Sequence, residues 1–254
     1  MEIFYELNPP KIVKGHRFDL VELNAGMQEM ADRASKLSGL VSGIHLTDSV
    51  LGIPRVSSVT AAGYLKTRVN PATQSCSIRV RDRNFTSLCQ AVSDAIMIGI
   101  DSLLILLGDD PASGRSDSGL RPSAAVTMLR NEGYGSNIKL DLSFPAKVED
   151  KLCPSLRNKL EARPHSLVTQ SIASLSDLGE IVDIAKSHGI RVTAVVMVPV
   201  EKNRHSASLI GLDWAQYERD PADFVKGAAG IADRVLLTSP NSFGAGFELL
   251  KQLK

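Results

Sequence analysis

Two carboxylates of this chain stand where carboxylates are unusual. Glu6 lies in the run IFYEL, among side chains that read as a buried strand, and Asp109 directly follows the aliphatic run LLILLG. A carboxylate in apolar surroundings must be paired, hydrogen-bonded or protonated. Two acids that converge on one cleft would suit proton transfer and the stabilisation of a developing cation. Glu6 and Asp109 are therefore our first catalytic candidates.

Two arginines form a further polar pair in the segment SIRVRDRN. Ser77, Arg79 and Arg81 share one face of the expected strand because side chains alternate along a strand. If Ile78 and Val80 pack against helices, the side chains of both arginines point into the interior of the fold. They would then either pair with nearby acids as a structural network or hold the phosphate or carboxylate of a ligand. The residues leave both interpretations open.

Eight short apolar segments could position these side chains. They cover residues 2–7, 41–47, 76–81, 102–108, 139–144, 166–172, 191–198 and 234–238. Segments with helical spacing lie between them, and Gly99 and Gly189 follow two of these where a left-handed helix terminator belongs. This alternation predicts an α/β fold, a (β/α)₈ TIM barrel that forms a single domain over residues 1–254. A doubly wound open sheet is the alternative.

Polar residues recur at the ends of the expected strands. Glu6, Thr47, Arg81, Asp109 and Gln170 each close or follow one of them. A single polar residue at a strand end is ordinary, because strands meet solvent there. In a TIM barrel, however, the active site lies at the carboxyl ends of the strands. The repetition therefore predicts an active site with an acidic mouth.

Composition excludes several classes of partner. A net charge of +1 favours a small, mostly uncharged substrate over nucleic acid or an anionic membrane. The longest aliphatic run, 103–107, is too short to span a bilayer, and we expect a cytoplasmic protein. Three separated cysteines and five histidines, His16 among them, lack metal-ligand spacing, so we expect no metal. No interface signature stands out, which leaves a homo-oligomer open.

The ordered motifs resemble those of the methylenetetrahydrofolate reductase family. YELNPPK resembles the family's opening FEFxPPK, IHLTDS its second strand VxVTxG, and SIRVRDRN its HLTCRDRN. LLGDDP resembles its LRGDPP, and LVTQ its ITQ. The resemblance is spread over most of the chain. It implies a TIM-barrel flavoprotein that binds FAD, takes reducing equivalents from NADH or NADPH, and reduces the methylene group of a reduced folate to methyl, in one-carbon metabolism and methionine biosynthesis.

The resemblance also implies roles for individual residues. Glu6 matches the general acid that protonates the folate nitrogen and opens the five-membered ring to an iminium. Asp109 matches the aspartate beside flavin and pterin, and Gln170 matches the glutamine that hydrogen-bonds the pterin. Thr47 matches a threonine of the flavin site. Lys159 matches a lysine at the ribityl–phosphate part of the flavin.

The chain departs from the family mainly on the flavin side. Ser77 replaces the histidine of HLTC, Leu107 replaces the arginine of LRGD, and FPAKVE replaces YPExHP. Phe144 keeps an aromatic side chain for a flavin contact, and Arg79 and Arg81 could hold a cofactor anion instead. A different hydride donor, and a pterin such as tetrahydromethanopterin, are alternatives. Two further alternatives are a pterin-binding barrel without reductase activity, as a regulatory or partner subunit, and a non-redox one-carbon transfer enzyme.

Overall fold

The computed structural model describes residues 1–14, 17–69, 71, 73–110, 117–150 and 153–254. Within these residues, eight strands close into a barrel whose recorded strand pairs are parallel. In barrel order they are β1 (Ile3–Leu7), β10 (Arg234–Thr238), β9 (Arg191–Met197), β8 (Ser166–Ser171), β7 (Lys139–Phe144), β6 (Ser102–Leu106), β5 (Gln74–Arg79) and β4 (Gly43–Leu46). The predicted TIM-barrel class is confirmed, and the open sheet is excluded because the strand order closes on itself.

Helices alternate with these strands along the chain. They are α1 (Leu20–Leu37), α2 (Ser58–Arg68), α3 (Phe85–Ile98), α4 (Pro122–Asn131), α5 (Pro154–Glu161), α6 (Leu175–Ser187), α7 (Arg204–Leu209), α8 (Pro221–Ile231) and α9 (Phe243–Gln252). Three short 3₁₀ turns cover Val50–Gly52, Tyr134–Ser136 and Glu201–Asn203. Two-residue strands β2 (Val13–Lys14) and β3 (Arg17–Phe18) pair antiparallel outside the barrel.

Local sequence signals explain where several helices begin and end. Asn84 caps α3 through a side-chain oxygen that accepts from Ser87 N, and Ser174 caps α6 in the same way. Gly99 ends α3 at φ 77° and Gly189 follows α6 at φ 67°, a conformation that glycine adopts without steric cost. Both glycines therefore have the predicted role of helix terminator.

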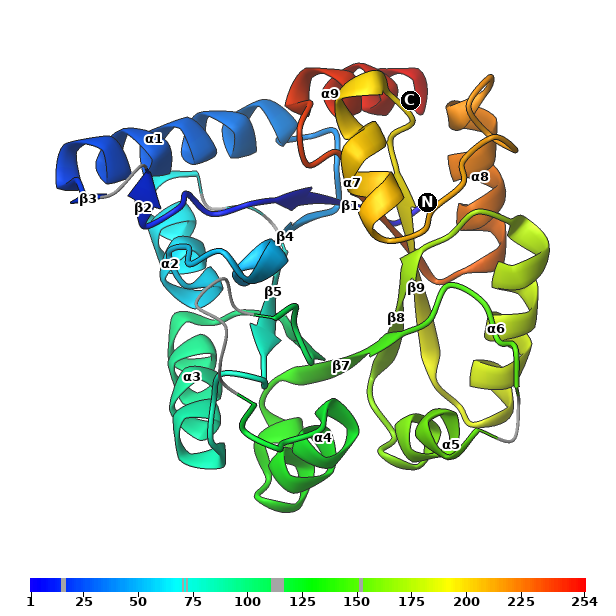
Figure 1. Cartoon of the computed structure of the whole chain (residues 1–254), viewed down its shortest axis with the longest axis horizontal. Coiled ribbons are helices and arrows are strands. Elements are labelled where there is room, and N and C mark those ends of the chain that lie inside the picture. The colour runs from blue at the N-terminus through cyan, green and yellow to red at the C-terminus, as the bar shows by residue number, and fades with distance from the viewer. Residues whose placement is uncertain (15–16, 70, 72, 111–116, 151–152) are drawn as a thin grey trace. The chain divides into compact units, whose positions relative to one another are not determined.

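The contacts divide the chain into two compact units. The first unit comprises Met1–Glu6, Gly39–Ser42 and Ser143–Lys254, and the second comprises Leu7–Ser38 and Gly43–Leu142. In the first unit, α6 packs on β9 and beside α8, whereas in the second α2 packs on β5 and beside α3 (Figure 1). The barrel is one fold, but the boundaries of a single domain over residues 1–254 stay a prediction.

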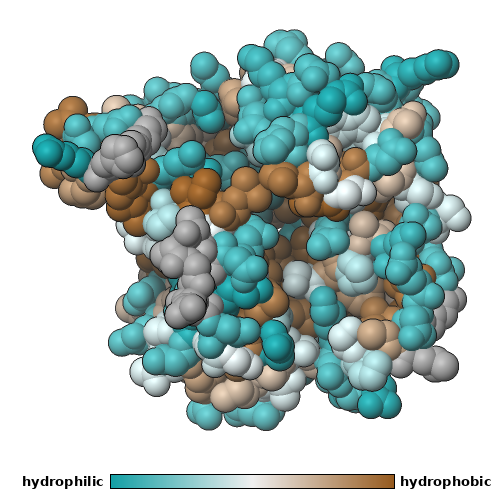
Figure 2. Space-filling model, in the orientation of Figure 1, coloured by the Kyte–Doolittle hydropathy of each residue, from teal (hydrophilic) through white to brown (hydrophobic). Residues whose placement is uncertain are grey.

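The second unit exposes apolar side chains near its β2–β3 hairpin. Val13, Phe18, Leu20 and Val21 are 42 to 80% exposed, and Figure 2 shows apolar surface beside the start of α1. This surface is compatible with self-association, which stays a prediction. Among the described residues, no helix is both long and apolar enough to cross a bilayer.

Candidate active site

Strand β1 presents Glu6 on the face that its alternation predicts. The Tyr5 hydroxyl donates to the carbonyl oxygen of Phe243 in α9 at 3.4 Å, so Tyr5 points to the helical layer. Phe4 lies on the opposite face, with its ring centroid 4.0 Å from the guanidinium carbon of Arg234. Glu6 follows Phe4 at a spacing of two and shares that inner face.

The Glu6 carboxyl group accepts a hydrogen bond from the neighbouring strand β10. The Thr238 hydroxyl, at the end of β10, donates to Glu6 Oε1 at 2.6 Å. Burial raises the pKa of Glu6 above its usual 4.5, and the hydrogen bond from Thr238 opposes that rise. The residue as a whole is half-buried, and the carboxyl group itself is surrounded by protein atoms. A general acid needs a carboxyl group whose pKa lies above the usual range, and burial shifts the pKa of Glu6 in that direction.

A cavity of about 790 Å³ in the first unit collects three of the predicted site residues. Phe144, Lys159 and Gln170 all line it. They come from the end of β7, from α5 and from the end of β8. The carboxyl ends of neighbouring parallel strands meet at one rim of a barrel, which explains why residues far apart in sequence share this cavity.

Lys159 is tied to the end of β7. Its Nζ donates to the carbonyl oxygen of Ser143 at 2.7 Å and lies 5.9 Å from the centroid of the Phe144 ring. Burial lowers the pKa of Lys159, since desolvation disfavours the ammonium. An ammonium carries three donors, so two N–H groups remain beyond the recorded bond. The anionic or carbonyl oxygen of a ligand would satisfy them.

Gln170 is the one exposed residue of β8. The register of β8 against β9 shifts between Val168 and Ser171, and such an irregularity re-aims side chains. The amide offers both a donor and an acceptor to the cavity. The Gln170 amide is therefore suited to hydrogen-bond with the edge of a heterocycle that carries a donor and an acceptor.

The cavity also holds charged residues that the sequence analysis did not single out. These are Lys147, Glu149, Asp150, Asp177 and Asp213. Lys147 Nζ lies 2.9 Å from Glu149 Oε1, so this pair largely neutralises itself. Most of them lie in loops, where charge is common and no periodicity marks it. Asp150, Asp177 and Asp213 add negative charge to the lining of the cavity.

Asp109 lies in the second unit, shortly after β6. Its Oδ2 accepts from the backbone N of Leu51 at 2.7 Å, and its own carbonyl oxygen accepts from Arg79 Nη2 at 2.7 Å. The side chain is exposed. The Leu51 contact closes a loop in which Leu51 has φ 58°. Asp109 thus has at least a structural role, and its convergence with Glu6, which belongs to the first unit, stays a prediction.

Arg79 is deeply buried, at 1% exposure. Its Nη1 donates to the carbonyl oxygen of Ser49 at 2.6 Å, its Nη2 to that of Asp109, and its Nε lies 2.9 Å from Asp82 Oδ2. Arg81 donates through Nε to Gly108 O at 3.1 Å and pairs with an acid, Asp110, at 2.5 Å. For Arg79 these contacts favour the structural network over ligand binding. A cofactor role for either arginine stays a prediction.

The hydroxyl groups predicted for the flavin side also have protein partners. Thr47 Oγ1 donates to Asn8 Oδ1 at 2.6 Å. Buried His45 lies between two serines of β5, with Nε2 2.8 Å from Ser77 Oγ and Nδ1 2.8 Å from Ser75 Oγ. Strand β5 therefore turns its serines inward, as the alternation predicts. The cofactor contacts of Thr47 and Ser77 stay predictions.

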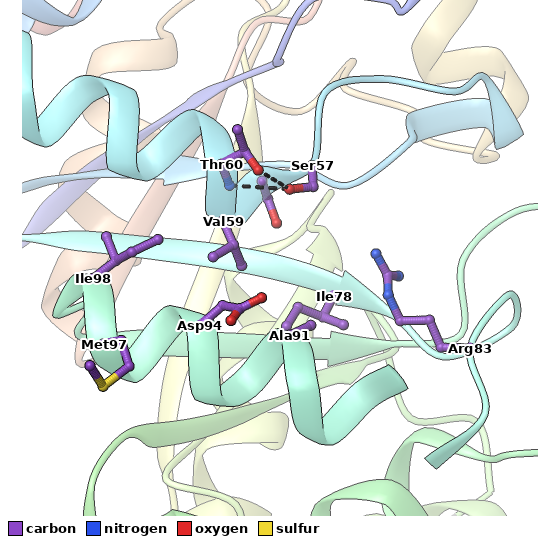
Figure 3. Close-up of a pocket in the computed structure, with 10 residues that line it drawn as sticks. Ser57, Val59, Thr60, Ile78, Arg83, Ala91, Asp94, Met97 and Ile98 are labelled. Carbon is purple, nitrogen blue, oxygen red and sulfur yellow. Dashed lines mark hydrogen bonds between the residues drawn. The ribbon is translucent and has the colours of Figure 1, made fainter. Parts of the chain in front are cut away.

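A smaller cavity of about 280 Å³ lies in the second unit between α2 and α3. Figure 3 shows Ser57 hydrogen-bonded to Thr60 at the start of α2, with Met97 and Ile98 at the end of α3. Its floor includes Ile78, whose side chain points outward from β5. It contains none of the predicted site residues. The larger cavity is therefore the better candidate site.

Metal ligands do not gather in the part of the chain that the structure describes. No group of three or more His, Cys, Asp or Glu side chains there could hold a metal ion. His16 lies outside the described residues.

Comparison with known proteins identifies the fold. No protein-family model and no curated protein matches the chain. The 7,8-dihydropteroate synthase of Vibrio fischeri ES114 aligns with a TM-score of 0.54 and 12% identity, over 99% of this chain and 91% of that chain. A riboflavin lyase solved with modified FMN and its substrate riboflavin aligns with a TM-score of 0.63 and 9% identity, over 99% of this chain and 90% of that chain.

An aldolase, QR15, is a third similar structure. It aligns with a TM-score of 0.56 and 10% identity, over 99% of this chain and 95% of that chain. At such identities these likenesses show the TIM-barrel fold alone.

Proposed function

We propose that the protein is an oxidoreductase similar to methylenetetrahydrofolate reductase, which reduces the methylene group of a reduced pterin to methyl. The observation that carries the proposal is Glu6, an enclosed carboxyl group whose pKa is raised, in the motif that resembles the family's acid. The cavity that collects Gln170, Lys159 and Phe144 supports it. The pterin is of the folate type, and tetrahydromethanopterin would meet the same groups.

The residues of the first unit fit a flavin in part. Lys159 offers N–H groups beyond its bond to Ser143, and Phe144 supplies an aromatic wall. A bound flavin, FAD in the family, would supply the hydride that NADH or NADPH provides. Two fold neighbours support the idea by analogy alone: one is named for dihydropteroate, and the other contains modified FMN and riboflavin.

The chain's own residues would divide the chemistry as follows. Glu6 holds a proton and donates it to the folate nitrogen that leaves the methylene carbon, which opens the five-membered ring to an iminium. The Gln170 amide orients the pterin through a donor and an acceptor. Asp109 matches the family's aspartate beside flavin and pterin, and in this proposal it stabilises the positive charge of the iminium. Reduction of the iminium by hydride then leaves a methyl group.

One observation favours a second candidate function. Thr47, Ser77 and Arg79, predicted for the flavin side, have their polar atoms engaged by other protein groups. A pterin-binding barrel without reductase activity would need only the first-unit cavity. A one-carbon transfer enzyme without redox chemistry is a further alternative, and it would turn over without flavin or nicotinamide.

The experiment that tests the proposal combines spectroscopy with product analysis. The purified protein is mixed anaerobically with FAD, NADH or NADPH, and methylenetetrahydrofolate, and the methyl product is measured by mass spectrometry. We expect a flavin absorption band that bleaches with nicotinamide, and formation of methyltetrahydrofolate. A protein that takes up no FAD and makes no methyl product, yet binds the pterin, would support the binding-protein alternative instead.

Glu6→Gln is the informative variant and Glu2→Gln its matched control. Glu2 directly precedes the same strand, at a spacing that places it on the same face, but it pairs with Arg234 at 2.7 Å. Loss of a general acid lowers turnover by a factor of about 100 to 10,000. We expect that loss for Glu6→Gln and near-normal turnover for Glu2→Gln.

A further inference from the structure

We propose that Thr238 is the positioning residue of the acid: its hydroxyl holds Glu6 Oε1, so that the proton delivered to the substrate is carried by Glu6 Oε2. The inference rests on the proposed function of Glu6 as general acid. It concerns one hydrogen bond, which can be measured without catalysis.

The two residues lie side by side at the ends of paired strands. The register of β1 and β10 joins Tyr5 to Leu237, so Glu6 and Thr238 are the next pair along. Thr238 is 4% exposed, and its carbonyl oxygen accepts from Val198 N at 2.9 Å. A β-branched side chain on a fixed backbone has few rotamers. The hydroxyl is thus held in place before any substrate binds.

The direction of the hydrogen bond decides which oxygen carries the proton. A hydroxyl has one hydrogen, and that of Thr238 is donated to Oε1 over 2.6 Å. When Glu6 is protonated, Oε1 keeps its role as acceptor, and the proton occupies Oε2. Oε2 is then the oxygen that can face a substrate.

The same bond limits the effect of burial on the acid. Burial raises the pKa of Glu6 and the donor from Thr238 lowers it. The charged groups on this face of β1 and β10, Glu2 and Arg234, lie at the opposite ends of the strands and pair with each other. Met197, which is paired with Thr238 in β9, carries no charge. Among the described residues of the first unit, Thr238 is thus the neighbour whose hydrogen bond lowers the pKa of Glu6.

Two variants separate positioning from folding. Thr238→Val removes the hydroxyl and keeps the shape, whereas Thr238→Ser keeps the hydroxyl. The titration of Glu6 is followed by NMR on protein labelled with ¹³C at the glutamate carboxyl, and Glu6→Gln assigns the signal. We expect Thr238→Val to raise the pKa of Glu6. In Thr238→Ser the pKa of Glu6 should stay close to its value in the natural protein.

Activity supplies a second readout. We expect kcat/KM near neutral pH to fall roughly tenfold in Thr238→Val, the scale of one hydrogen bond, and to recover in Thr238→Ser. In Thr238→Val the alkaline limb of the pH profile of kcat/KM should move to higher pH, because Glu6 stays protonated up to a higher pH. An unchanged Glu6 titration in a folded Thr238→Val protein overturns the inference. If the titration shifts but the natural protein makes no methyl product, the placement of Thr238 holds and the reductase proposal fails.

Discussion

Gly108 lies directly against the buried guanidinium of Arg79. A Cβ atom at position 108 would come within 2.6 Å of Arg79 Nε, and the backbone there has φ 87°. Arg79 cannot move away cheaply, because two carbonyl oxygens and Asp82 hold it. The glycine of the LLGDDP motif is therefore required by packing as well as by backbone conformation.

This contact predicts a large effect for Gly108→Ala. Gly133 is a matched control, because it has the same φ of 87° and a Cβ atom there would meet nothing within 4 Å. Gly133→Ala should lower the free energy of unfolding by about 1 kcal/mol through backbone strain, and Gly108→Ala by roughly 2–4 kcal/mol because the clash adds to it. Urea denaturation of both variants measures the difference. Equal losses would contradict the role given to Arg79.

Two arginines at the end of β5 should also differ from each other: Arg79 is the last residue of the strand, and Arg81 lies two positions beyond it. Arg79→Lys loses the forked donation to two carbonyl oxygens and should cost roughly 2–4 kcal/mol of unfolding free energy. Arg81→Lys breaks an ion pair with the exposed Asp110 and should cost about 1 kcal/mol or less. Thermal and urea unfolding are the measurements. A stable Arg79→Lys protein that loses anion binding would instead favour the ligand-binding interpretation.

The strands could be predicted because their signals are local. Each apolar run that we expected overlaps a barrel strand, and 139–144 and 234–238 have the predicted limits, whereas β5 begins at Gln74, two residues before the expected run 76–81. The hairpin of β2 and β3 escaped prediction, since strands of two residues show no alternation. Local periodicity and helix terminators were thus sufficient for the fold class.

The environment of the acid could not be predicted. The partner of Glu6 is Thr238, 232 positions away, and pairing between distant strands depends on a barrel order that sequence does not display. The exposure of Gln170 depends on a register shift in β8, which leaves no mark in the sequence. The motif located both residues, but only the structure supplies their contacts.

Glu6→Gln should make the protein more stable at neutral pH. The pKa of Glu6 is raised in the folded protein above its unfolded value of 4.5, so the natural protein loses stability as pH rises from that value through the folded pKa. Glutamine does not ionise and keeps an acceptor for Thr238. Melting temperatures measured from acidic to neutral pH should converge at acidic pH and separate above. A Glu6→Gln protein that is less stable at neutral pH would show that the carboxylate is stabilised in the fold.

Gln170 should contribute to pterin affinity. Gln170→Leu removes the amide from the cavity and should weaken binding of the reduced pterin roughly tenfold, as expected for one or two hydrogen bonds. Gln252→Leu is the control, because Gln252 is an exposed glutamine of the same unit that does not line the cavity. Calorimetric titration with tetrahydrofolate measures both. Unchanged affinity in Gln170→Leu would contradict the proposal that the pterin binds in this cavity.

The most direct test separates the two half-reactions in the natural protein and in Glu6→Gln. Each protein, loaded with FAD and reduced by nicotinamide under anaerobic conditions, is mixed with methylenetetrahydrofolate, and flavin absorbance is followed by stopped flow. We predict that both proteins are reduced at similar rates, and that reoxidation by the pterin is about 100 to 10,000 times slower in Glu6→Gln. Reoxidation of Glu6→Gln at the natural rate, or a parallel loss of both half-reactions, would contradict the assignment of Glu6 as the acid.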